Sequence, residues 1–144
     1  MPLTYAKSIL TPALALILWS LVVWIWMYAT RIPAIQAARL NPNAAREPGS
    51  LNVLPLKVRQ VAYNYNHLME QPTLFYALVF YTQLANRWVT DIPLILAWVY
   101  VALRVVHSLV QATVNVILVR FALHVAGTLT LMGLAAWNLW RMLG

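Results

Sequence analysis

Long stretches of apolar residues, rarely interrupted by charge, dominate the chain and predict membrane-spanning helices. The first stretch covers residues 9–29 and contains no charged side chain. The hydrocarbon core of a bilayer is about 30 Å thick and requires about 20 apolar residues in a helix. This stretch is therefore long enough to cross a membrane, and its Pro12 is tolerated because it lies in the first helical turn.

A second span is predicted around a proline. Residues 72–88 are apolar but short for a membrane crossing. They become a full span if the helix begins upstream, so we expect one helix over residues 59–88. Pro72 lies inside it and should kink or loosen the helix, because proline lacks the N–H that the preceding turn requires.

The C-terminal part of the chain predicts two more spans. Residues 92–144 are apolar almost throughout, and as one helix they would measure about 80 Å at 1.5 Å per residue. The segment must therefore fold back. Arg120, with Asn115 before it, marks the reversal and places spans at residues 92–115 and 119–141.

Loop charges predict the orientation of these four helices. The loop at residues 30–58 and the start of the next helix carry most of the basic residues, and the other side carries few. Because cytoplasmic loops are enriched in Lys and Arg, this loop is expected in the cytoplasm and both termini on the non-cytoplasmic side. The basic residues near the loop are Arg31, Arg39, Arg46, Lys57 and Arg59, against Glu47; those on the other side are Lys7, Arg87 and Arg141, with Asp91.

Composition supports a membrane protein. We therefore expect an all-α fold of four transmembrane helices in a left-handed bundle, forming one domain over residues 1–144. The chain is 62% hydrophobic and only 9% charged, whereas soluble domains have about a quarter of their residues charged. It contains no cysteine, which excludes disulfides, thiolate metal sites and a cysteine nucleophile. The net charge of +7 comes without a polybasic run, so we read it as a determinant of topology and of anion attraction rather than of nucleic-acid binding.

A stripe of polar residues follows the third predicted span. On a helix with about 100° per residue, these side chains share an arc of about 100°. An Arg inside hydrocarbon costs roughly 2.5–3.5 kcal/mol on insertion scales, so such a stripe needs polar partners. Its members are Tyr100, Arg104, His107, Ser108, Gln111 and Asn115.

A second stripe precedes Pro72 and consists of Arg59, Tyr63, Asn66 and Glu70. Together the two stripes predict a polar pocket between helices that opens toward the basic, cytoplasmic face. The structural alternative is that these residues only join neighbouring helices, with Glu70 and Arg104 forming an ion pair.

The charges predict the chemistry of a ligand. Arg31, Arg104 and Arg120 lie near one membrane face and suit an anion held through bidentate carboxylate contacts, whereas Glu70 suits an ammonium group. No metal site is expected, because the chain has only three acidic residues and the spacing of its histidines does not match a ligand motif. The four glycines form no phosphate-binding loop.

Two segments resemble the MAPEG superfamily, the membrane-associated proteins in eicosanoid and glutathione metabolism. They are "NYNHLMEQPTLFYAL" at residues 64–78 and "ALRVVHSLVQATVNVILVRF" at residues 102–121, and the likeness is greatest to the bacterial branch. The resemblance extends from the first span to the C-terminus. It implies a homotrimer in the bacterial inner membrane, with glutathione as co-substrate bound between adjacent subunits near the cytoplasmic face.

The resemblance also implies roles for individual residues. Asn66 and Glu70 match the glutathione-binding Asn and Glu of the second span, here four positions apart where the eicosanoid enzymes have three. Arg104 and His107 match the Arg-x-x-His pair of the third span. Arg120, sixteen positions beyond Arg104, matches the catalytic Arg that stabilises the glutathione thiolate. Two looser matches are Gln111, where the synthases often have a Tyr that contacts the ligand, and Arg31, at the end of the first span.

Two departures from the family pattern argue against prostaglandin synthesis. Phe121 follows Arg120 where prostaglandin E synthase has a Ser, and Tyr63 and Tyr65 occupy the stretch where that enzyme has a cluster of Arg residues.

The predicted function is that of an integral membrane glutathione-dependent transferase or peroxidase, acting on lipophilic electrophiles or lipid hydroperoxides that arrive from the bilayer. The alternative is a non-catalytic trimeric membrane protein that binds glutathione, lipid or a protein partner. A small transporter is a weaker third option, because the sequence shows no pair of broken helices for alternating access.

Overall fold

The computed structural model describes residues 8–41, 49–86 and 90–144, and every regular element in these ranges is helical. The parts of the predictions that concern Lys7, Arg46, Glu47 and Arg87 lie outside the described residues. The elements are the α-helices α2 (Leu10–Ala37), α3 (Leu56–Glu70), α4 (Pro72–Ala85), α5 (Asp91–Ala112) and α6 (Ile117–Leu143), with a short 3₁₀ helix η2 (Ser50–Val53).

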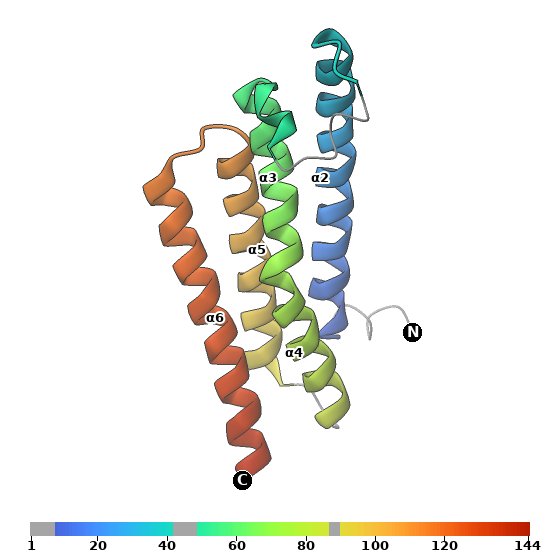
Figure 1. The fold of residues 1–144 in the computed structure, drawn as a ribbon. Helices are drawn as coiled ribbons and strands as arrows, with labels where there is room; N and C mark the ends of the chain where they lie inside the picture. Colours follow the sequence, from blue (N-terminus) through green and yellow to red (C-terminus); the bar gives the residue numbers. More distant parts are fainter. Residues whose placement is uncertain (1–7, 42–48, 87–89) are drawn as a thin grey trace.

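The helices run side by side, and α3 and α4 follow one another as a single rod (Figure 1). The all-α, four-helix prediction is therefore confirmed. Helix α5 occupies the middle of the arrangement, because it packs against α2, α3, α4 and α6. Helix α2 begins and α6 ends at the lower end of Figure 1, whereas η2 and the α5–α6 turn lie at the upper end.

The expected interruption of the second helix occurs at Gln71, immediately before Pro72. Pro72 has no N–H to donate to the preceding turn, so the helical hydrogen-bond pattern is interrupted at this position. Gln71 itself keeps helical backbone angles, with φ −61° and ψ −36°. The Thr73 hydroxyl donates to the Glu70 carbonyl over 2.6 Å, which satisfies an acceptor at the break. The rod therefore stays nearly continuous while its backbone is locally loosened.

The chain reverses between α5 and α6 at residues 113–116, close to the position that the sequence indicated. Asn115 has φ +52°, in the left-handed region that Asn tolerates better than most residues. Its N–H donates to the Val110 carbonyl over 2.7 Å, and its side-chain oxygen accepts a bond of 2.6 Å from Nη1 of Arg120. One residue thus closes α5 and holds the first turn of α6.

The outer surface carries many large apolar side chains, as expected of a protein surrounded by lipid. The core around α5 is small and includes Leu16, Phe75, Val79 and Tyr100, all fully buried. Large apolar side chains such as Ile25 project outward instead. Helices α2, α5 and α6 are each long and apolar enough to cross a membrane.

The left-handed backbone of Asn115 yields a prediction about stability. Asn115→Ala should lower the free energy of unfolding by about 1–2 kcal/mol, because alanine bears a Cβ and lacks a side-chain oxygen to support the left-handed conformation. Asn115→Gly also loses the bond to Arg120 but adopts positive φ freely, so it should be the more stable of the two variants. Unfolding by denaturant in detergent measures both, and equal stability would contradict a role for the backbone angle.

Candidate functional site

A pocket of about 370 Å³ lies between α3, α5 and α6, toward the end of the molecule where α5 turns into α6. It combines a polar interior with two apolar side chains. The residues that line it are His67, His107, Ile117, Arg120, Phe121 and His124. The structure therefore brings two predicted site residues, His107 and Arg120, into one pocket.

Three histidines from three helices meet in this pocket. The ring centroid of His67 lies 5.0 Å from that of His107 and 5.3 Å from that of His124. The His107 and His124 rings are 6.4 Å apart. Sequence spacing gave no sign of this cluster, because the residues are far apart in the chain and meet only through helix packing. Within the described ranges, no group of three or more metal-ligating side chains could hold a metal ion.

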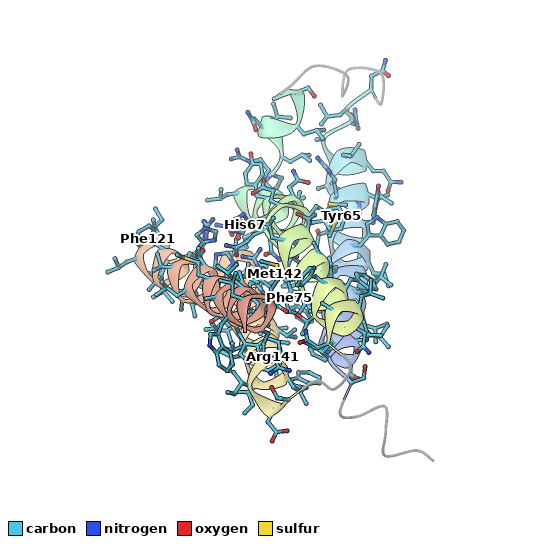
Figure 2. The ribbon with its side chains drawn as sticks, turned by 90° about the horizontal axis from the view of Figure 1, so that it is seen from below. Tyr65, His67, Phe75, Phe121, Arg141 and Met142 are labelled. Atoms are coloured by element: carbon cyan, nitrogen blue, oxygen red, sulfur yellow. The ribbon has the colours of Figure 1, made fainter. Side chains whose placement is uncertain are left out.

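The four pocket residues on α6 share one face of that helix. Ile117, Arg120, Phe121 and His124 are spaced three and four apart, which aligns side chains along a helix surface. Ile117 is 77% and Phe121 64% exposed, so the mouth of the pocket borders the apolar exterior. In Figure 2, Phe121 lies on α6 at the outer side of the bundle, and His67 lies on α3 nearer the centre.

Arg120 is held in place by Asn115, and one of its N–H groups remains available to a ligand. Its Nη1 is bonded to Asn115, which anchors the guanidinium at the start of α6. Its Nε is buried and has no hydrogen-bond partner in the described part of the chain. A buried N–H without a partner costs about 1–3 kcal/mol, so an acceptor in the pocket would stabilise this arrangement.

Arg104 lies beneath the pocket and is only 1% exposed. Its Nη2 donates to the His67 carbonyl over 2.9 Å, and its Nη1 donates to Oε1 of Gln71 over 3.3 Å. The Arg104–Glu70 ion pair considered from the sequence is wrong for a single chain. Glu70 instead contacts Nδ1 of His67 over 3.2 Å, and its side chain is 69% exposed.

Gln71 is the residue that sequence reasoning missed. Besides accepting from Arg104, its Nε2 donates to the Thr128 hydroxyl over 2.7 Å, and its Oε1 lies 3.5 Å from the Tyr100 hydroxyl. It therefore joins the α3–α4 break to α5 and α6. The one available signal was its position directly before Pro72, where a break exposes polar groups that need partners.

The stripe predicted on the second span does not face the pocket within one chain. Asn66, Tyr63 and Glu70 are exposed on the outer side of α3. The stripe on α5 does face inward, with Gln111 buried and its Oε1 unpartnered in the described residues. Ser108 of this stripe accepts a 2.5 Å bond from Nδ2 of Asn64, another residue that the sequence stripe did not include.

Arg31 lies outside the pocket that the three histidines line. It borders a separate pocket of about 170 Å³ between α2, the η2 segment and the start of α3. Arg59 and Tyr63 also line that pocket, and each bonds back to the η2 segment: Nε of Arg59 to the Leu54 carbonyl, and the Tyr63 hydroxyl to Asn52. One chain thus divides the predicted site residues among the histidine pocket, the outer side of α3 and this smaller pocket.

Comparison with known protein families decides the assignment that these helices and motifs indicate. The MAPEG family matches residues 9–140. The chain belongs to the MAPEG family. A search of curated proteins and a search of solved structures gave no significant match.

MAPEG membership fits the observed fold, since members are four-helix membrane bundles. The chain is accordingly a multi-pass integral membrane protein. MAPEG proteins are associated with glutathione-dependent transferase and peroxidase activities, typically bind glutathione and are commonly trimeric.

The Gln71 network yields a prediction within this MAPEG bundle. Gln71→Leu should lower the free energy of unfolding by about 1–3 kcal/mol, because it strips Arg104 of its side-chain acceptor in a buried setting. Gln83→Leu is the matched control, since Gln83 lies on α4 and makes no side-chain hydrogen bond in the described residues. Denaturant unfolding in detergent compares the two, and equal losses would show that Gln71 has no special role.

Proposed function

We propose that this MAPEG protein is a glutathione-dependent transferase or peroxidase that acts on lipophilic electrophiles or lipid hydroperoxides. The observation that supports it best is the pocket beside Arg120, where a cationic and imidazole-lined interior adjoins an apolar mouth. Such a pocket offers an anion a place next to a route for apolar substrates. We place glutathione there as co-substrate.

The chemistry depends on forming the thiolate of glutathione. A free thiol has a pKa of about 8.5, and only the thiolate is strongly nucleophilic. A guanidinium within hydrogen-bond distance lowers the thiol pKa, and it cannot lose its own proton at physiological pH. The unpartnered Nε of Arg120 is the group that we assign to the sulfur.

The rest of the glutathione site requires a second subunit. Asn66 and Glu70 face outward from α3, where a charged side chain in lipid would be costly. In a homotrimer they would meet the neighbouring copy, and Glu70 could bind the ammonium group while Arg31 binds a carboxylate. His107 would contact the tripeptide within the histidine pocket, and Gln111, one turn further along α5, would offer its unpartnered Oε1. Arg104 has a different part in our proposal, because its bonds to Gln71 and His67 make it a positioning residue below the ligand.

The second substrate enters from the membrane. Ile117 and Phe121 are exposed beside the pocket, so an apolar tail can remain in lipid while its reactive group reaches Arg120. We place this end of the molecule at the cytoplasmic face of a bacterial inner membrane, with both termini on the other side. Glutathione would then reach the pocket from the cytoplasm.

The test of this function is the thiolate itself. Wild-type protein with glutathione at neutral pH should show the ultraviolet absorption band of a thiolate, and Arg120→Leu should lose that band more completely than it loses affinity. Arg120→Lys should partly restore the band, because a point charge still favours the anion although the planar fork is lost. Arg141→Leu, at the opposite end of α6, is the matched control and should leave the band unchanged.

If the wild type binds glutathione but shows no thiolate band and no turnover with an aryl halide or a fatty acid hydroperoxide, the enzymatic proposal is wrong. The chain would then be a non-catalytic protein that binds glutathione. The bulky Phe121 beside Arg120 would be the first residue to replace by Ser in that case.

The oligomer makes a separate prediction. Because Asn66 and Glu70 are polar and exposed on a membrane helix, native mass measurement in mild detergent should find a trimer. A strictly monomeric protein would contradict both the trimer and the placement of these residues at a subunit interface.

A further inference from the structure

The histidine cluster holds more hydrogen-bonding capacity than the binding of glutathione requires. Of its three rings, only that of His67 has a hydrogen-bond partner, which is the carboxylate of Glu70. The His107 and His124 rings make no hydrogen bond in the described residues, and Nδ1 of His124 is buried without a partner. Unpaired ring nitrogens next to a substrate pocket suit proton transfer better than structural support.

The rings of the cluster also lie close to one another and to Arg120. His124 lies one turn beyond Arg120 on the same face of α6, so a sulfur held by Arg120 would lie beside the His124 ring. The ring of His67 is 5.3 Å from that of His124, close enough for one water to join their nitrogens. On its far side, His67 contacts the exposed Glu70 over 3.2 Å. A water between the two rings would therefore join His67 to His124, which share no direct hydrogen bond in the described residues.

Charged groups from all three helices surround the cluster. Arg104 on α5 and Arg120 on α6 are cationic, and Glu70 on α3 is the carboxylate that contacts His67. Glutathione with its sulfur ionised has a net negative charge, because its two carboxylates and its thiolate outnumber its ammonium group. Bound glutathione would therefore bring negative charge next to the two arginines and the three rings.

Building on the proposed function, we propose that His124 is the general acid for hydroperoxide reduction and that His67, the neighbouring ring, resupplies its proton. In this proposal the histidine cluster takes part in the reduction of lipid hydroperoxides. It takes no part in reactions of electrophiles with stable leaving groups.

The glutathione thiolate attacks the terminal oxygen of the hydroperoxide, so that an S–O bond forms and the O–O bond breaks. The sulfur is oxidised to a sulfenic acid, and the electron pair of the broken bond goes to the leaving alkoxide. His124 gives its proton to that alkoxide, which departs as an alcohol. The thiolate of a second glutathione then attacks the sulfenic sulfur, so that an S–S bond forms, the S–O bond breaks and the leaving hydroxide takes a proton to become water. The two protons lost by the two thiols equal the two used, one by the alcohol and one by the water.

Conjugation to an aryl halide needs no such acid, because halide departs as a stable anion. The two reactions therefore separate the role of His124 from that of Arg120. General acid catalysis contributes about 10²–10⁴-fold to a rate, so the effect should be large in one reaction and small in the other.

The experiment measures both reactions in His124→Asn and His124→Ala. Hydroperoxide kcat should fall at least about tenfold in each, while conjugation changes by less than about twofold. Added imidazole should restore hydroperoxide reduction in His124→Ala but not in His124→Asn, because only the smaller side chain leaves room for it. Thr130→Ala is the matched control on α6, since Thr130 bonds only to its own helix, and it should leave both reactions unchanged.

Equal losses in both reactions, or no rescue by imidazole, would overturn the assignment of His124 while leaving the proposed function intact. Absence of both reactions in the wild type would instead refute the proposed function and this inference together.

Discussion

The burial of Arg104 is the constraint on which the rest of the structure depends. A guanidinium that is 1% exposed inside a membrane bundle needs acceptors, and within the described residues it has no carboxylate partner. The protein supplies the Gln71 side chain and the His67 carbonyl instead. Both lie at or near the break before Pro72, so the α3–α4 rod is tied to α5 at the point where its own hydrogen bonding is weakest.

The position of the pocket follows from that attachment. Arg104 fixes the backbone of His67, whose ring then meets those of His107 and His124. Gln71 extends the same attachment to α6 through Thr128, four residues beyond His124. The charge that is expensive to bury therefore positions the side chains that we assign to binding and proton transfer, and it adds a positive potential below them.

The sequence predicted the four-helix arrangement because a bilayer leaves few alternatives, but α2 continues to Ala37, past the predicted end of its span at residue 29. Apolar length and Pro72 indicated where the chain crosses and where it breaks, and the apolar stretch after residue 92 had to fold back near Asn115. The stripe on α5 was also recognisable, since its members repeat with the helical period.

The contacts between helices were beyond sequence reasoning. Helical periodicity identifies a polar face but does not say which helix it meets, so Gln71 and the meeting of the three histidines were missed. The same limit applies to Glu70, which shares a face with Asn66 yet points away from Arg104 in a single chain. The periodicity of one sequence does not show which residues of a second subunit would contact that face.

Calorimetric titration of the purified protein tests most directly whether this pocket binds glutathione. Glutathione and its S-methyl analogue should both bind, because most contacts involve the carboxylates and the ammonium group. Glutathione should bind more tightly, since only its sulfur can pair as an anion with Arg120. Failure of both compounds to bind would contradict the account and leave the polar residues as contacts that hold the helices together.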